Sequence, residues 1–152
     1  MATRLLDWTQ NPLAALFFAV EEPAKNKKKK AVLWCFKPDE SDYVKDLEKE
    51  SPFQSGRTKV FVPNSVTSRI RVQKGFFSVH KRSTKAGHFV PLQNHQRLKS
   101  KLHKIEIDPA DFSQLRDTLD VCGVNRSSLF PDLDGLYKYL TWYYSKLEDE
   151  NE

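Results

Sequence analysis

Three residues near the start of the chain carry the groups that a nucleotide site needs. Arg4 and Asp7 lie three positions apart, and Trp8 follows directly. The first hypothesis is that the guanidinium or the carboxylate faces a nucleotide, with the Trp8 ring as a stacking wall. The alternative is a buried Arg4–Asp7 pair that fixes the turn into the following segment.

Hydroxyl, amide and glycine positions extend this set of candidate ligand contacts. Thr3 and Thr9 have hydroxyls suited to ribose or phosphate, although helix capping explains them equally. The Gln73 amide can orient a ribose hydroxyl, and Gly75 permits close approach of the backbone to a ligand. The alternative for Gln73 and Gly75 is a bulge or turn before the next strand.

Titratable groups supply the candidates for proton transfer. His80 ends an apolar segment in basic surroundings, where it is either a general base or a solvent-exposed histidine. Asp132 and Asp134 fall in the first turn of the last predicted helix, where negative charge complements the helix dipole. A paired acid site is the catalytic alternative for these two aspartates.

Charge is strongly segregated along the 152 residues. The net charge is +5, yet residues 51–105 contain no Asp or Glu, and hold twelve Lys or Arg and all four histidines. An acid-free basic stretch favours an anion, so Arg69 and Arg71 are further candidates for ligand binding. The alternative is internal compensation by the acidic C-terminal helices. With no carboxylate beside the histidines, we expect no metal.

Five segments have the composition of strands, rich in β-branched and aromatic residues. The predicted strands cover residues 3–8, 31–36, 58–62, 76–80 and 102–107. After the first, Asn11 or Thr9 can cap a helix, and Pro12 suits its first turn. Residues 12–21 are apolar on all sides, so we expect this helix to be buried.

Two helices are expected near the C-terminal end. The first begins at Asp108 and closes at Gly123. The last carries apolar residues at spacings of three and four, predicted to face the core: Leu129, Leu133, Leu136, Leu140, Tyr143 and Leu147. Aromatic residues flank this stripe and would mark a binding surface if exposed: Tyr137, Tyr139, Trp142 and Tyr144. The fold class is α+β, with one small mixed or antiparallel sheet of about five strands.

Three blocks resemble the FRG domain, a bacterial and phage-associated family. The first is Thr3–Thr9 with the helix Asn11–Ala19, the second runs from Arg69 through Gln73 and Gly75 to Phe77, and the third is Leu129–Leu136. The resemblance implies one partial FRG domain over residues 1–147, followed by a frayed acidic tail over 148–152.

The family layout is similar to that of ADP-ribosyltransferases, which implies NAD as a candidate cofactor and Gln73 as a catalytic candidate. The family pattern has an aromatic-Arg-Gly strand before the first block, and here Met1-Ala2 stands there. We expect either a partner chain that supplies that strand or a homo-oligomer, and whether the isolated chain is an enzyme stays open. The competing functions are a non-catalytic interaction module in phage conflict and nucleic-acid binding through residues 57–104.

The length of the apolar runs and the cysteine content bear on where in the cell the chain is expected. The longest apolar run is Leu13–Val20, far too short to cross a bilayer, and no signal peptide is visible. We expect a cytoplasmic location and no membrane contact. Cys35 and Cys122 are expected to be reduced thiols in or near the core.

Overall fold

The computed structural model describes residues 4–24, 29–64, 72–81 and 90–150. The chain forms two compact units. The first unit comprises residues 1–8, 34–66 and 75–103, and the second comprises residues 9–33, 67–74 and 104–152. The predicted α+β class is confirmed. Thr3, Arg69 and Arg71 lie outside the described residues.

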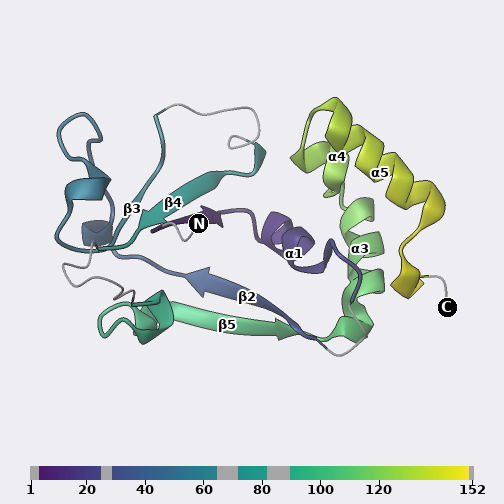
Figure 1. Cartoon of the computed structure of the whole chain (residues 1–152), viewed down its shortest axis with the longest axis horizontal. Coiled ribbons are helices and arrows are strands. Elements are labelled where there is room, and N and C mark those ends of the chain that lie inside the picture. Colours follow the sequence, from purple (N-terminus) through teal and green to yellow (C-terminus); the bar gives the residue numbers. More distant parts are fainter. Residues whose placement is uncertain (1–3, 25–28, 65–71, 82–89, 151–152) are drawn as a thin grey trace. The chain divides into compact units, whose positions relative to one another are not determined.

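Three of the five strands form one sheet. Its strands are β1 (Leu5–Thr9), β3 (Lys59–Phe61) and β4 (Gly75–Val79), in the order β1-β4-β3 (Figure 1). β3 and β4 are antiparallel, and Val60 lies opposite Ser78. At one end of β1, the backbone N–H of His80 donates to the Arg4 carbonyl over 2.9 Å. β4 is therefore the central strand.

The other two strands form a sheet of their own. β2 (Ala31–Phe36) pairs with β5 (Leu102–Ile107), so the five predicted strands divide between two sheets. The predicted bounds of these two strands are confirmed exactly. Strand position follows from local composition, whereas the pairing depends on residues far away in sequence, which is why the number of sheets was not predicted.

Helix α1 (Pro12–Val20) begins as the sequence indicates. The Asn11 side chain accepts from the N–H groups of Leu13 and Ala14 at 3.1 and 3.3 Å, and Pro12 occupies the first turn. The prediction that this helix is buried on all sides was wrong. One face is buried, and Leu13 and Phe18 on the other are 40% and 41% exposed. An all-apolar composition does not reveal how many sides neighbours will cover.

The core of the second unit gathers around α1 and α3 (Phe112–Val121), which pack together (Figure 1). Gly123 adopts φ 73° and ends α3, as predicted, and its N–H donates to the Asp120 carbonyl at 2.8 Å. The buried members of this core come from six segments of the unit: Ala14, Phe17, Val20, Ala24, Ile107, Phe112, Leu119, Leu129 and Phe130.

Two further helices follow, α4 (Arg126–Leu129) and α5 (Leu133–Ser145). The predicted core-facing stripe of the last helix was wrong. Leu129 is buried, but Leu133, Leu136, Leu140 and Tyr143 are 85%, 44%, 42% and 50% exposed. The buried residue of α5 is Gly135, which lies against the Phe130 backbone. The helix therefore turns its glycine face inward and its leucine face outward.

The described part of the acidic C-terminal segment, residues 148–150, is bound, which the prediction of a frayed tail did not foresee. Arg116 on α3 is 5% exposed and pairs with Asp149 at 2.6 Å and with Glu150. The same guanidinium donates to the Val20 carbonyl at 2.8 Å. Asp149 also accepts from the Ala24 N–H at 3.1 Å. These bonds tie the short helix η7 (Glu148–Glu150) to the end of α1.

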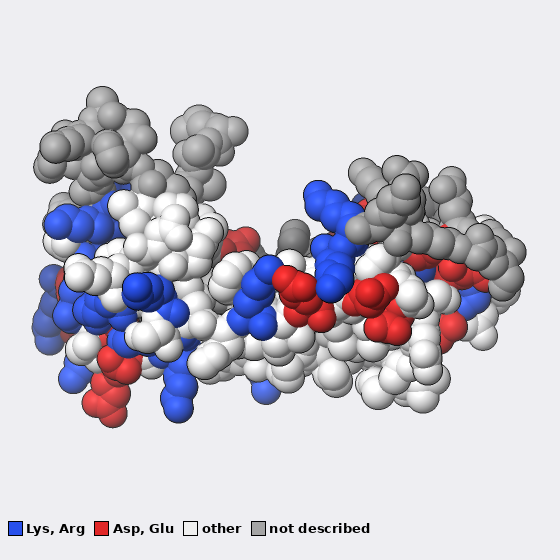
Figure 2. All heavy atoms as spheres, turned by 90° about the horizontal axis from the view of Figure 1, so that it is seen from below, with Lys and Arg blue, Asp and Glu red and all other residues white. Residues whose placement is uncertain are grey.

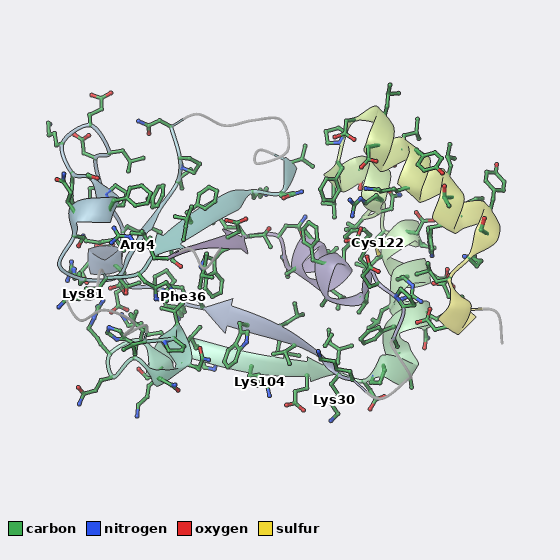
Figure 3. All side chains as sticks on the ribbon, viewed as in Figure 1. Arg4, Lys30, Phe36, Lys81, Lys104 and Cys122 are labelled. Carbon is green, nitrogen blue, oxygen red and sulfur yellow. The ribbon has the colours of Figure 1, made fainter. Side chains whose placement is uncertain are left out.

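Both cysteines are free, as expected of reduced thiols, but neither lies in the core. Cys35 on β2 and Cys122 just after α3 (Figure 3) are exposed. The core was predicted for Cys35 because its neighbours in the sequence are apolar. Ala31 and Leu33, which share a face of β2 with Cys35, pack against the core, but that core does not include Cys35.

Candidate functional site

The first unit contains a cavity of about 370 Å³ lined by aromatic rings. Its walls come from β1, β2, the end of β4, the segment around η4 (Leu92–Asn94) and the start of β5. The lining residues are Leu6, Trp8, Trp34, His80, Pro91, Leu92, Gln93 and Leu102. Small-molecule sites are typically apolar hollows of roughly this size with a few polar groups. Two indoles, an imidazole and one amide give this cavity that character.

Trp8 is held rigidly in the cavity wall. Its indole N–H donates to the Ser78 hydroxyl at 2.8 Å, and Ser78 is fully buried on β4. The ring also lies 5.3 Å from that of Phe36, which ends β2 (Figure 3). Leu6 and Trp8 share one face of β1 because alternate residues of a strand point the same way. Neighbouring residues therefore fix the position of the Trp8 ring, and its role as a stacking wall stays a prediction.

His80 presents an imidazole that is neutral at physiological pH. The residue is 4% exposed, and burial lowers its pKa below the usual 6.5, helped by the charge of nearby His95. A buried, neutral ring can stack or hydrogen-bond without attracting a counter-ion. The prediction of a solvent-exposed histidine was wrong, and the general-base role stays a prediction.

The buried carboxylate of Asp42 holds the segment that follows η4, next to the cavity wall. Asp42 is 1% exposed and pairs with Arg97 at 2.6 Å and with Lys101 at 2.7 Å. Both cations lie just beyond η4, which carries Leu92 and Gln93 into the cavity. Burial alone would raise the pKa of Asp42, but hydrogen bonds from Lys101, the Asp39 N–H and Arg97 lower it to about 2.

The free energy of unfolding of the first unit should therefore fall at low pH. Because the pKa of Asp42 is about 2 in the fold against 3.8 ordinarily, its contribution is complete above pH 3.8 and is lost as the pH falls through 2. That contribution is about 2 kcal/mol. Urea unfolding between pH 5 and about 2 should show this loss, and Asp42→Asn should remove that part of the pH dependence. An Asp42→Asn variant with the wild-type acid profile would contradict the assignment.

The other residues predicted near the start make structural contacts. Arg4 donates to the Phe53 carbonyl and lies 5.6 Å from its ring, and it does not pair with Asp7 among the described residues. Asp7 is exposed. The Thr9 hydroxyl donates to the Gln73 carbonyl and accepts from the Asn11 N–H at 3.0 Å. The N-cap of α1 is Asn11, so Thr9 closes the turn before the helix and does not cap it.

Gln73 and Gly75 surround the turn before β4. The Gln73 amide donates to the Leu129 carbonyl at 3.1 Å, and Lys74 between them adopts φ 48°. A turn at this place was the alternative reading of the sequence, and Gly75 opens β4. Gln73 does not line the aromatic cavity. Its catalytic role stays a prediction without support from its contacts.

The two aspartates of α5 are engaged at the start of that helix. Asp132 accepts from the Gly135 N–H at 2.7 Å as the N-cap, and Asp134 pairs with Lys138 at 2.7 Å. These contacts match the structural alternative given for them. Neither aspartate lines the aromatic cavity.

Three cations of the basic stretch are compensated within the first unit. Figure 2 shows Lys and Arg side chains gathered over the first unit with Asp and Glu among them. Arg97, Lys101 and Lys59 pair with Asp42, Asp39 and Glu50, all from the acidic segment 39–50. The C-terminal helices are not the source of these partners. A nucleic-acid backbone would have to compete with existing ion pairs.

A second cavity, of about 270 Å³, lies in the second unit between α1, α3 and α5. Three of its lining cations are already paired, because Arg116 binds Asp149, Arg126 binds Glu21 and Lys138 binds Asp134. Little unpaired positive charge therefore remains in this cavity for an anion.

These observations define an α+β chain with an aromatic cavity whose wall includes part of its first strand. The model of the FRG domain family matches residues 1–28, which include β1, Trp8 and α1. Recognition of the FRG pattern in the opening block is thereby confirmed over those residues. No curated protein and no solved structure matches the chain. Among the described helices, none has the length and apolarity needed to cross a bilayer.

Trp34 is the aromatic residue of the cavity that sequence reasoning missed. It lies in the strand 31–36, which was predicted correctly, and its size was the available signal. A tryptophan buries a large surface and prefers a ring or a ligand beside it. Nothing local, however, indicates that β2 brings this ring close to Trp8.

Proposed function

We propose that the chain is a nucleotide-binding module that holds a flat heteroaromatic base in the cavity of Trp8, Trp34 and His80. The single observation that carries this proposal is the pairing of two indoles with a neutral imidazole in one hollow of about 370 Å³. Stacking on such rings stabilises a bound base by roughly 1–3 kcal/mol per contact. The base of NAD, or of another nucleotide, has the required shape.

The lining residues fit the base better than they fit a whole dinucleotide. Among the described residues that line the cavity there is no Lys or Arg, so a pyrophosphate would find no cation among them. The described cation next in sequence to a lining residue is Lys81, which directly follows His80 (Figure 3). We therefore expect the base to contribute most of the binding energy and the phosphates to contribute less.

The contacts favour binding of a nucleotide without transfer of ADP-ribose. Transfer of ADP-ribose would need an acidic or amide group next to the ribose. Gln73, Asp132 and Asp134 are bonded elsewhere in the second unit. An ADP-ribosyltransferase activity, and a role in phage conflict, would be added to this binding and would need evidence of their own.

Removal of the Trp8 ring should abolish most of the affinity. Calorimetry with NAD, AMP and nicotinamide should show binding to the wild type, and Trp8→Leu should weaken it at least about tenfold, the equivalent of 1.4 kcal/mol. Base-containing ligands should also quench tryptophan fluorescence, because two of the three tryptophans line the cavity.

The matched control is Trp142→Phe, which removes the tryptophan of the second unit and leaves the cavity intact. That variant should keep both the affinity and the quenching. Circular dichroism would confirm that the Trp8→Leu variant is folded. Absence of heat with every base-containing ligand, or wild-type affinity of Trp8→Leu, would exclude the cavity as a nucleotide site.

A further inference from the structure

Helix α5 has two apolar faces, and one of them is exposed. At about 100° per residue, its inner face comprises Gly135, Tyr139 and Trp142. A polar strip of Asp134, Lys138, Thr141 and Ser145 runs along one side. The outer face occupies the remaining arc of about 120°. Its residues are 42–85% exposed: Leu133, Leu136, Tyr137, Leu140, Tyr143 and Tyr144.

This outer face has the pattern of a helix–helix interface. Its residues follow spacings of three and four over almost the full length of the helix, as in a coiled-coil seam. Large contiguous apolar patches are uncommon on isolated soluble chains and mark places where another surface docks. Three of the six side chains are tyrosines, which interfaces favour because the ring is buried while the hydroxyl stays wet.

We propose that α5 is the interface of an antiparallel homodimer, in which the outer face packs against the same face of a second copy. A two-fold axis beside Leu140 would bring the two Leu140 side chains together. It would place Tyr137 of one copy against Tyr143 of the other, and Leu136 against Tyr144. A two-fold interface requires such self-complementarity, because the same patch serves both subunits.

Charge favours the antiparallel direction. The N-terminal end of α5 carries Asp132 and Asp134, and Lys146 follows its C-terminal end. Antiparallel pairing places Asp134 of one helix near Lys146 of the other, which also pairs with Asp117 of its own chain at 3.1 Å, and it opposes the two helix dipoles. The Asp134–Lys138 half of the polar strip would face the hydroxyls of Thr141 and Ser145 in the second copy. A parallel pair would instead bring like charges together.

The available area suits a weak dimer. A helix of 13 residues is about 20 Å long, and six such side chains can bury on the order of 500 Å² per copy. The total of about 1,000 Å² is at the lower end of specific interfaces. The dimer should therefore form in a concentration-dependent way, independently of the base-binding cavity.

Sedimentation velocity of the full chain over a wide concentration range tests this proposal. The wild type should shift from monomer to dimer as concentration rises. Leu140→Glu, which would place two carboxylates on the axis, should weaken dimerisation at least tenfold without changing the circular dichroism. The matched control is Val121→Glu, because Val121 on α3 is 89% exposed and lies outside the stripe. It should leave the dimer unchanged.

Cross-linking tests the position of the axis. In a Cys35→Ser, Cys122→Ser background, Leu140→Cys should give a symmetric disulfide when diamide oxidises the two thiols, whereas Val121→Cys should not. Tyr144→Ser, at a residue 79% exposed, is a second disrupting variant that cannot disturb the core. A wild type that stays monomeric throughout, a Leu140→Glu dimer of unchanged strength, or equal cross-linking at positions 121 and 140 would overturn the proposal.

Discussion

Replacement of Gly135 by alanine should destabilise the second unit by about 3 kcal/mol, in the upper range for overpacking. An added Cβ would overlap the Phe130 carbonyl and lie 2.8 Å from the Phe130 Cβ. The obstacle is mainly backbone, so no side-chain rotation can relieve it. Chemical denaturation of wild type and variant would measure the loss.

Gly56 offers the matched control. A Cβ at Gly56 would meet nothing within 4 Å, so Gly56→Ala should be neutral or slightly stabilising. If Gly135→Ala were as stable as Gly56→Ala, the close packing of α5 on Phe130 would be disproved. The outward orientation of the α5 leucines would then lose its physical reason as well.

Replacement of Arg116 by alanine should cost roughly 3 kcal/mol and release the C-terminal segment. The Arg116 guanidinium satisfies two carboxylates and the Val20 carbonyl in a buried setting. Without it, Asp149 and Glu150, whose side chains are 8% and 3% exposed, would lose their cation and move into solvent. Hydrogen exchange should show loss of protection at Ala24 and in residues 147–150, together with a lower unfolding free energy.

A double-mutant cycle separates the ion pairs from simple packing. Asp149→Ala with Glu150→Ala should also destabilise the chain, and adding Arg116→Ala to that pair should cost much less than it does alone. Arg116→Lys should fall between, because an ammonium group lacks the planar fork that contacts three partners. Fully additive losses would show that Arg116 acts through its carbon chain and not through these bonds.

The two units respond to different variants, which gives the functional test a clear design. Gly135 and Arg116 lie in the second unit, whereas Trp8, Trp34 and His80 line a cavity of the first. Loss of base binding in Trp8→Leu alone would therefore report on the cavity and not on general unfolding. The match of the FRG family to residues 1–28 covers Trp8 but neither Trp34 nor His80.

Short-range physical chemistry made part of the fold predictable. The Asn11 cap, the Pro12 first turn and the Gly123 end depend on groups within a few residues of one another. The strands 31–36 and 102–107 follow from composition for the same reason. Trp8 could be proposed as a stacking ring because its residue type and its place in the predicted first strand were visible in the sequence.

Tertiary structure alone decided which faces are inner and which charges are paired. The leucine stripe of α5 has the pattern of a core face, but Gly135 allows a closer approach to Phe130 and takes that place. Asp42 and Arg116 acquire their roles from partners more than thirty positions away. The sequence by itself thus determined the helix ends, most of the strands and one cavity ring. Burial and pairing were left to the fold, because the energy of each such contact depends on a neighbour that local sequence does not specify.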